Sequence, residues 1–381
     1  MKEGIKMTNY QRCSRCIMDN KSDNTITFDN TGHCNYCTEA LSQIGKVYFP
    51  NEEGDKRLQE LIARLRKENK NKQYDCIMGI SGGLDSSYLA YLGAVRWGLR
   101  ILALHVDDGY DTEISKRNIR RLCETAKIRL VTIKPDAKQF NELTRAYILA
   151  GVPNLAAPQD NVLFACVYKF MKEQGIRTFL SGGNFALECI LQRGNTHDAN
   201  DVRNIRDINS RFGREKIDKL QLLSNLQRDI DSRLLRIESP RPLNYIDYNR
   251  ERALKELNEF CGFEYYGSKH LENTLTKFIQ VYWFYHKFNV DKRTSHLSSM
   301  IVSGQMSREE ALKVLQEPLY DEKEMEEEIN YILKCVGLSR NEFESIMKAS
   351  PKQHTDYKTS SYIKVRKTLI RITRILLGMN K

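Results

Sequence analysis

Two groups of residues in this chain have types and spacings that could support chemistry. The first is the string Ser81-Gly82-Gly83-Leu84-Asp85-Ser86, which follows a short apolar run and opens a pattern with helical spacing. Backbone N–H groups and the dipole at a helix start bind phosphate, and two glycines let the backbone approach the anion closely. The hydroxyls of Ser81, Ser86 and Ser87 can add donors. Asp85 can accept from helix-start amides or help to hold Mg²⁺.

The second group is a set of cysteines with metal-ligand spacing. Cys13 and Cys16 form one C-x2-C pair, and Cys34 and Cys37 form another after 17 intervening residues. This spacing predicts a zinc knuckle with four thiolate ligands, which leaves no open coordination position and therefore indicates a structural role. A redox or sulfur-relay pair and an iron–sulfur centre are the alternatives. The other six cysteines fall singly and are predicted to be buried core residues.

The elements that must position the loop alternate between two periodicities. Strands are predicted at 74–80, 101–106, 129–133 and 177–180, and helices at 55–71, 84–97, 113–126 and 161–174. This alternation is typical of βαβ units and predicts an α/β fold with a parallel sheet. Gly182 and Gly183 follow the fourth strand, so they are expected at the same carboxyl edge of the sheet as the phosphate loop, where open α/β folds bind ligands. A plain turn is the alternative for this pair.

Length and composition limit the domain organisation. A chain of 381 residues with 41% hydrophobic and 29% charged residues is expected to fold into two or three units. We predict a zinc-binding module at 1–50, an ATP domain at 51–200, a largely helical substrate-binding region at 201–315 and a helical C-terminal region at 316–381. The sequence shows no apolar run of membrane-spanning length and no secretion signal, so a cytoplasmic location is expected. The net charge of +11 indicates a polyanionic partner.

The phosphate loop lacks the lysine of a Walker A motif, which disfavours kinase-type phosphoryl transfer. Ser-Gly-Gly-x-Asp-Ser after a strand resembles the PP-loop of the ATP pyrophosphatases, which have an adenine nucleotide alpha hydrolase-like fold and include asparagine synthetase, GMP synthetase and several tRNA-modifying enzymes. The resemblance implies that the loop holds the pyrophosphate of ATP with Mg²⁺ while the α-phosphorus is attacked and AMP becomes a leaving group. It also implies that the segment 105–109 lodges the adenosine half, where Asp107 would bind ribose or metal.

A wider resemblance covers most of the chain up to about residue 315. Segments 12–19, 263–273, 276–278, 291–299 and 304–312, together with the loop, are similar to the N-acetyl sugar amidotransferases of surface-polysaccharide biosynthesis, including lipopolysaccharide and O-antigen. The resemblance implies that an acetamido group on a nucleotide-linked sugar, such as a UDP sugar, becomes an acetamidino group at the expense of ATP. Ammonia would come from a partner glutaminase resembling that of imidazole glycerol phosphate synthase, possibly accompanied by a cyclase-like subunit.

The basic residues of these segments are the predicted substrate contacts. Lys269, His270, Lys277, Lys292 and Arg293 are expected to bind the sugar-nucleotide diphosphate or the ATP phosphates through charge-assisted hydrogen bonds. Lys269 and His270 are also predicted, with Asp85, to be catalytic. The alternative is a set of surface charges.

Other interpretations remain open for the tail and for the whole chain. Residues 362–381 have the pattern of a basic amphipathic helix, which would contact an anionic membrane or a partner subunit, or pack on its own protein. A tRNA-modifying enzyme of the thiolase type would suit the charge and the zinc module, but the paired cysteines lie before the ATP domain, so nucleic acid is not the expected partner. A non-catalytic scaffold that binds zinc and nucleotide is the other alternative.

Overall fold

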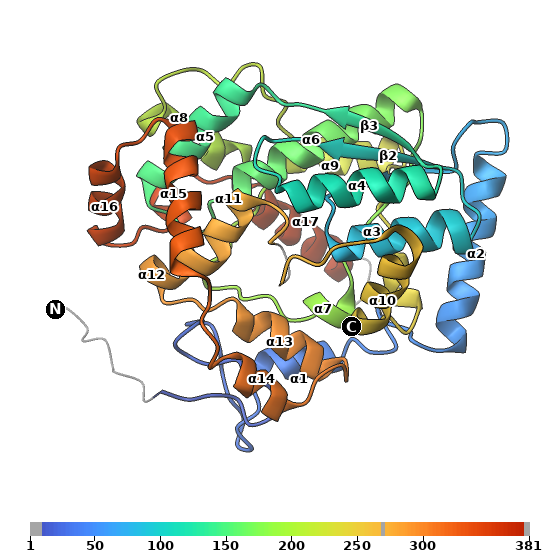
Figure 1. The fold of residues 1–381 in the computed structure, drawn as a ribbon, viewed down its shortest axis with the longest axis horizontal. Helices are drawn as coiled ribbons and strands as arrows, with labels where there is room; N and C mark the ends of the chain where they lie inside the picture. The colour runs from blue at the N-terminus through green and yellow to red at the C-terminus, as the bar shows by residue number, and fades with distance from the viewer. Residues whose placement is uncertain (1–9, 268–270, 377–381) are drawn as a thin grey trace.

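The computed structural model describes residues 10–267 and 271–376 (Figure 1). It contains a parallel four-stranded sheet. The strands lie in the order β3-β2-β1-β4. Their bounds are Cys76–Gly79 for β1, Ile101–Val106 for β2, Arg129–Ile133 for β3 and Phe179–Leu180 for β4. The α/β fold expected from the alternating periodicities is therefore confirmed, and the predicted bounds of β2 and β3 coincide with those observed.

Helices make up most of the rest of the described chain. The α-helices are α1 Asn35–Leu41, α2 Glu52–Glu68, α3 Leu84–Tyr91, α4 Glu113–Thr125, α5 Ala137–Ala150, α6 Ala157–Gln174, α7 Phe185–Glu188, α8 Val202–Phe212, α9 Asn225–Leu234, α10 Arg250–Cys261, α11 Thr274–Lys277, α12 Phe284–Phe288, α13 Arg293–Val302, α14 Arg308–Val314, α15 Glu322–Val336, α16 Arg340–Lys348 and α17 Tyr362–Leu376. Two π-helical turns, η1 Leu92–Arg96 and η3 Phe278–Trp283, and two 3₁₀ turns, η2 Pro242–Tyr245 and η4 His354–Asp356, complete the set.

Both faces of the sheet are covered, because successive residues of a strand point to opposite sides and here both sides are apolar. Cys76 and Met78 of β1 pack in one hydrophobic cluster with residues of α2, α3, α4 and α10. Ile77 packs in another with residues of α6. The sheet is thus the middle of three layers, which explains why its strands read as nearly continuous apolar runs.

The strand order creates one place where the chain changes direction across the sheet. From β1 the chain proceeds outward through β2 to β3, and it then returns to the other side of β1 to form β4. The loops after β1 and β4 therefore leave neighbouring strands at the same carboxyl edge, where the strand order reverses, and open α/β sheets bind ligands in the crevice at such a point. The loop beginning at Ser81 and the loop beginning at Ser181 both follow these two strands.

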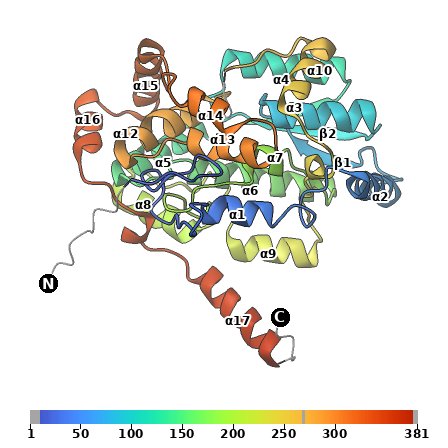
Figure 2. The same cartoon turned by 90° about the horizontal axis from the view of Figure 1, so that it is seen from below.

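The second half of the chain is mostly helical, as expected, and a large core joins it to the first half. One hydrophobic cluster includes residues of α5, α6 and α8 together with residues of η3, α12, α15 and α16. Trp283 is fully buried in it, and its indole N–H donates to the carbonyl of Val152 at 2.9 Å. Figure 2 shows that α17 leaves this body and projects on the side on which α9 lies.

Candidate functional site

The loop between β1 and α3 needs glycine at its centre. Gly82 has φ +77°, a left-handed conformation that other residues rarely adopt. A Cβ atom at this position would lie 2.5 Å from the backbone oxygen of Ser115, at the start of α4. The backbone of the loop therefore packs directly on a neighbouring helix, which fixes the direction of its N–H groups.

Two serines of the loop hold its turn closed. The backbone N–H of Gly83 donates to Ser81 Oγ at 3.2 Å, and the N–H of Ser81 donates to Ser86 Oγ at 3.3 Å. The two hydroxyls are 3.2 Å apart. Ser87, by contrast, is fully buried and its hydroxyl has no hydrogen-bond partner among the described residues. Ser81 and Ser86 thus place hydroxyls beside the loop amides, whereas Ser87 faces the interior.

Asp85 is oriented by a residue that is distant in the sequence. The hydroxyl of Tyr248 donates to Asp85 Oδ1 at 2.5 Å, and Tyr248 is only 1% exposed. Burial, with the charge of Asp85 beside it, raises the pKa of Tyr248 well above its ordinary value, so the phenol stays protonated as the donor. No sequence motif marks Tyr248, because it precedes α10 and reaches the loop only through the packing of α10 on α3.

The loop after β4 meets the same helix start. A Cβ atom on Gly182 would lie 3.0 Å from the backbone nitrogen of Ser86. The N–H of Gly183 donates to Ser181 Oγ at 3.3 Å, a contact like the one that Ser81 makes in the first loop. The two Ser-Gly-Gly segments therefore lie side by side, as their positions after β1 and β4 require.

The end of β2 and the segment after it bring a histidine and three carboxylates to this edge. His105 is buried, with Nδ1 at 2.9 Å from the carbonyl of Ile80 and Nε2 at 2.9 Å from Asp111 Oδ2. Burial opposes its charged form, but the hydrogen bond and charge of Asp111 outweigh this effect and raise the pKa of His105. Asp107 binds Lys134 at 2.9 Å. Burial raises the pKa of Asp108, although Gln159 and Asn273 donate hydrogen bonds to it.

These loops form one wall of a cavity of about 740 Å³. Of the nucleotide contacts predicted from the sequence, six line it: Ser81, Gly83, Asp85, Ser86, Gly182 and Gly183. Gly82, Ser87 and Asp107 are not among its lining residues. A second wall comes from the second half of the chain and includes Glu272, Asn273, Thr276, Gln280, His296, Leu297, Met300, Met306, Val314 and Glu317.

The segment that precedes α11 lies directly on the loop between β1 and α3. The N–H of Leu84, at the start of α3, donates to the hydroxyl of Tyr266 at 2.9 Å. Ser81 Oγ is 3.3 Å from Glu272 Oε1. These contacts join the two walls of the cavity at the loop. Lys269 and His270, which were predicted to be catalytic and substrate-binding, lie outside the described residues.

The other predicted basic contacts have different surroundings. The ammonium of Lys277 is buried between Glu324 Oε1 at 2.7 Å and Glu328 Oε1 at 3.0 Å. Arg293 is bound to Asp291 at 2.8 Å. Lys292 stands over the ring of Phe284, with Nζ 5.6 Å from its centroid, and burial lowers the pKa of Lys292 to about 8. None of the three lines the cavity.

One arginine that was not among the predicted contacts does line the cavity. Arg250 begins α10 and lies over the ring of Tyr265, with its guanidinium carbon 4.8 Å from the ring centroid. It is the only lysine or arginine among the described lining residues, which otherwise include several carboxylates. No local motif marks this position, because its place in the site depends on how α10 packs against α3.

The four predicted metal-ligand cysteines lie together. The sulfurs of Cys13 and Cys37 are 3.7 Å apart and those of Cys16 and Cys34 are 3.6 Å apart, and all four side chains are fully buried. Four sulfurs at about 2.3 Å from a tetrahedral zinc ion would be separated by about 3.8 Å. Cys13 Sγ accepts from the N–H of Cys34 at 3.2 Å, which suits a thiolate. The donor set and its spacing therefore fit zinc.

The cysteine module is docked on the wall of the cavity. Arg308, the first residue of α14, donates to the carbonyls of Cys13 and Cys16, each at 3.1 Å. The N–H of Ile17 donates to Ser298 Oγ of α13 at 3.1 Å. Leu297, the neighbour of Ser298, lines the cavity. The module thus packs against α13 and α14, which contribute residues to the second wall of the cavity.

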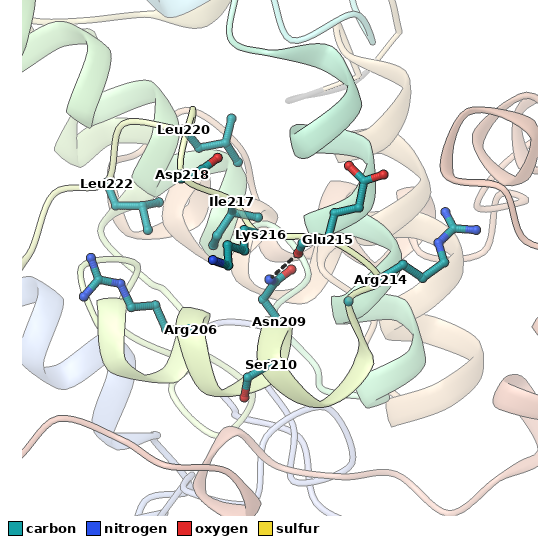
Figure 3. A pocket seen from close by; sticks show the side chains of 11 residues that line it. Arg206, Asn209, Ser210, Arg214, Glu215, Lys216, Ile217, Asp218, Leu220 and Leu222 are labelled. Atoms are coloured by element: carbon teal, nitrogen blue, oxygen red, sulfur yellow. Dashed lines mark hydrogen bonds between the residues drawn. The ribbon is translucent and has the colours of Figure 1, made fainter.

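A separate hollow of about 600 Å³ lies beside α8 (Figure 3). Its polar side chains are largely engaged with the protein: Arg214 binds Glu142 at 2.7 Å, and the amide of Asn209 donates to the carbonyl of Glu215 at 3.0 Å. None of the loops after β1, β2 and β4 contributes to it. The cavity at the carboxyl edge of the sheet is therefore the stronger candidate for the active site.

None of the described helices combines the length and the apolar character needed to cross a membrane.

Comparison with known proteins gives one local match to a curated protein and likenesses to solved structures. A Methanocaldococcus jannaschii protein described as uncharacterized is 27% identical over 126 residues, which are 33% of this chain and 43% of that protein. The chain thus matches less than half the length of this relative. The solved structures include an NH3-dependent NAD synthetase from Campylobacter jejuni in complex with the nitrate ion, at 15% identity and a TM-score of 0.28. They also include NMN synthetase from Francisella tularensis, at 13% identity and a TM-score of 0.27. Each likeness covers 57% of this chain and 99% of the other.

A family model matches the part of the chain that forms the second wall of the cavity. The matched residues are 272–370, and the family is described as LPS biosynthesis protein WbpG-like, C-terminal domain. The match begins at Glu272, beside the loop between β1 and α3, and includes α11 to α16 and the start of α17. This part of the chain is therefore WbpG-like.

Proposed function

We propose that this protein is an ATP-dependent amidotransferase that converts an acetamido group of a nucleotide-linked sugar into an acetamidino group. ATP is cleaved to AMP and pyrophosphate, and ammonia from a partner glutaminase supplies the nitrogen. The reaction belongs to the synthesis of a surface polysaccharide. A zinc ion on the four cysteines has a structural role.

One observation carries this proposal. The cavity of about 740 Å³ is walled on one side by the Ser-Gly-Gly loops of the sheet and on the other by ten residues of the WbpG-like segment. A loop without the Walker A lysine, at a helix start, suits the pyrophosphate of ATP better than transfer of its γ-phosphoryl group. A second wall that resembles an LPS biosynthesis domain suits a sugar substrate.

The chemistry follows from the weakness of an amide as an electrophile. The acetamido oxygen attacks the α-phosphorus of ATP, the bond to the bridging oxygen breaks, and pyrophosphate leaves. Ammonia then adds to the carbon of the adenylylated amide, and AMP leaves with the former carbonyl oxygen. The two nitrogens remain on carbon as the amidine, and the surplus proton passes to solvent. No oxidant or reductant is required.

The residues of the first wall have separate parts in this reaction. The loop from Ser81 to Ser86 is placed to receive the pyrophosphate at the start of α3, where the helix dipole favours an anion. Asp85, held by Tyr248, is placed to orient Mg²⁺, which would neutralise phosphate charge. Arg250 is placed to bind a phosphate oxygen by a charge-assisted hydrogen bond. Gly182 lets the loop after β4 pack closely against the first turn of α3.

The cysteines support an external source of ammonia rather than a built-in glutaminase. No cysteine is found among the described residues that line the cavity. Burial raises the pKa of Cys123 and of Cys189 to about 12, so both remain thiols and are poor nucleophiles. The same facts speak against sulfur transfer by a tRNA-modifying enzyme, which would need a reactive cysteine near the ATP.

The proposal is tested by following AMP, pyrophosphate and sugar mass together. The purified protein is incubated with ATP, Mg²⁺, an ammonium salt and a panel of UDP-linked diacetamido sugars. We expect AMP release that depends on the sugar, and the mass loss that replacement of oxygen by NH produces. Asp85→Asn should abolish both signals, while Glu256→Gln, a change in α10 outside the cavity lining, should retain them.

Other outcomes would replace the proposal. AMP formation that requires tRNA rather than sugar would indicate an RNA-modifying enzyme. ATP binding without AMP formation, even when the glutaminase is added, would indicate a scaffold.

Activity with ammonium that rises further when glutaminase and glutamine replace the salt would support the partner subunit.

A further inference from the structure

Two neighbouring helices, neither of which contributes a described lining residue to the cavity, carry an exposed apolar stripe and a block of positive charge. On α9, Leu226 is 53% exposed, Ile230 is 38% exposed and Leu234 is 76% exposed. Their spacing of four residues places them on one face of the helix. Asp231, on the inner side, binds Lys172 of α6 at 3.1 Å. The helix is therefore anchored by its polar side and presents leucine and isoleucine to solvent.

The second helix, α17, is basic along its whole length. Residues 362–376 contain five lysines or arginines and no aspartate or glutamate. Val365 is 52% exposed and Ile370 is 38% exposed. A helix that combines exposed aliphatic residues with a dense set of cations is typical of segments that lie at the interface of an anionic bilayer.

Contacts between the two helices make them one surface. Asp229 of α9 accepts from the hydroxyl of Tyr362 at 2.9 Å and pairs with Arg366 Nε at 2.8 Å. Figure 2 shows α9 and α17 on the same side of the protein. A hollow of about 580 Å³ between α8, α9 and the start of α17 is lined by Leu226 and Tyr362 and by further cations, Arg203 and Arg206.

We propose that the α9–α17 surface, formed by Leu226, Ile230 and Leu234 together with α17, binds the face of an anionic membrane. Its charge is complementary to acidic lipid headgroups, and its aliphatic side chains can enter the headgroup and acyl boundary. A second copy of the same surface would bring two cationic helices together, which like charges oppose. Single-stranded nucleic acid is bound by rows of aromatic side chains, whereas the exposed apolar residues of this surface are aliphatic.

Vesicle flotation with the full 381-residue protein tests this surface. We expect the protein to float with phosphatidylcholine vesicles that contain phosphatidylglycerol, not with phosphatidylcholine alone, and to dissociate as salt screens the charges. The double variant Lys364→Glu/Arg371→Glu should lose more than about tenfold in binding to the anionic vesicles. Leu226→Ser/Leu234→Ser should weaken binding without changing the net charge.

Matched controls separate this effect from general surface properties. Leu191→Ser changes a leucine that is 55% exposed on another segment and should leave flotation unchanged. Lys255→Glu reverses a charge on the exposed side of α10 and should do the same. Mg-ATP binding and circular dichroism show that each variant is folded. Equal binding to neutral and anionic vesicles, unchanged binding by both double variants, or a dimer that the α9 variant dissociates would each overturn the proposal.

Discussion

Asp85 and Tyr248 illustrate how a single hydrogen bond can serve the site. The phenol donates to the carboxylate across 2.5 Å in a buried position. A hydrogen bond to a charged group contributes about 1.5–3 kcal/mol. Tyr248→Phe keeps the ring and removes only this donor, so we expect Mg-ATP to bind at least about tenfold more weakly. Isothermal titration calorimetry measures this change directly.

Tyr88 provides the matched control for that variant. It is also buried, its ring centroid is 5.7 Å from that of Tyr248, and its hydroxyl donates to Glu256 at 3.1 Å instead of to the loop. Tyr88→Phe should cost a similar amount of stability and leave the affinity for Mg-ATP unchanged. Equal loss of affinity in both variants would show that the tyrosines act through the general stability of α3 and α10.

His354 gives a pH dependence whose sign can be worked out. It lies stacked on His197 with ring centroids 4.4 Å apart, and burial, followed by the charge of His197, lowers the pKa of His354 to about 3. The unfolded chain, with a histidine pKa of about 6.5, binds a proton there that the folded protein excludes. This contribution to stability is therefore complete above about pH 6.5 and is lost as pH falls toward about 3, by up to about 1.4 kcal/mol per pH unit.

The variant His354→Gln removes this titration. Its free energy of unfolding, measured by urea denaturation between about pH 7 and about pH 5, should fall less steeply than that of the unchanged protein. Parallel pH profiles for the two proteins would contradict the assignment of the slope to His354.

At the residue scale, local motifs were recoverable from the sequence and remote partners were not. Ser81, Gly83, Asp85 and Ser86 line the cavity because a strand, a turn and a helix start place them there within a few residues. Arg250 and its neighbour Tyr248 reach the same site only because α10 packs against α3. No pattern near Arg250 encodes that packing. Lys277 was predicted to bind the substrate through its positive charge. Only the fold reveals that its ammonium pairs with two glutamates.

Gly82 carries a prediction about an element, the turn between β1 and α3. An alanine there would be held at φ +77° with its Cβ 2.5 Å from a backbone oxygen of α4. Left-handed geometry alone costs about 1–2 kcal/mol for such a residue, and the contact cannot be relieved by a rotamer change. Gly82→Ala should thus lower the free energy of unfolding by more than about 2 kcal/mol and disrupt Mg-ATP binding.

Gly175→Ala is the control for the turn. Gly175 ends α6 with φ +63° and nothing lies within 4 Å of a Cβ placed on it. Chemical denaturation should show only the cost of the left-handed conformation, about 1–2 kcal/mol, with Mg-ATP affinity retained. If the two variants lose the same amount of stability and bind Mg-ATP equally, the close approach of the loop to α4 has no energetic role.

The elements themselves were largely predictable because their periodicities are strong. β2 and β3 have the predicted bounds, and α4 ends within one residue of its prediction. The fourth strand is shorter than predicted, since only Phe179 and Leu180 pair with β1. The helix predicted at 84–97 becomes π-helical from Leu92 to Arg96. Such changes depend on tertiary packing, which a local periodicity does not report.

On the scale of the whole molecule, the distribution of charge separates two regions. The chain has a net charge of +11, yet the described lining of the cavity contains one arginine among several carboxylates. Much of the positive charge lies elsewhere, for example on α17, where residues 362–376 contain five lysines or arginines and no acidic residue. Carboxylates around the proposed ATP site suit a metal–nucleotide complex, whereas the basic surface suits a polyanion. The net charge of the sequence could indicate the basic surface. It could not indicate the carboxylates that line the cavity.

The cysteine module contacts α13 and α14, which contribute to the second wall of the cavity. These contacts lead to a prediction about zinc. Without zinc, the thiolates that Cys13, Cys16, Cys34 and Cys37 present to one another would repel, and the module is too small to fold on its own apolar residues. Removal of zinc by a chelator should therefore loosen the contacts of Arg308 and Ile17 with the module. We expect faster amide hydrogen exchange in α13 and α14, with little change in α3.

The same argument predicts how substrate binding divides between the two walls. Zinc removal, or Cys16→Ser, should weaken binding of the sugar nucleotide. Mg-ATP should still bind the loop after β1, because α3 is supported by α4 and α10 rather than by the module. Cys166→Ser, at a buried cysteine in the sheet-facing helix α6, should retain metal and both affinities. Zinc content, calorimetry and hydrogen exchange on the same samples distinguish these cases. Loss of ATP and sugar binding together would mean that the module holds the whole fold, not one wall of its cavity.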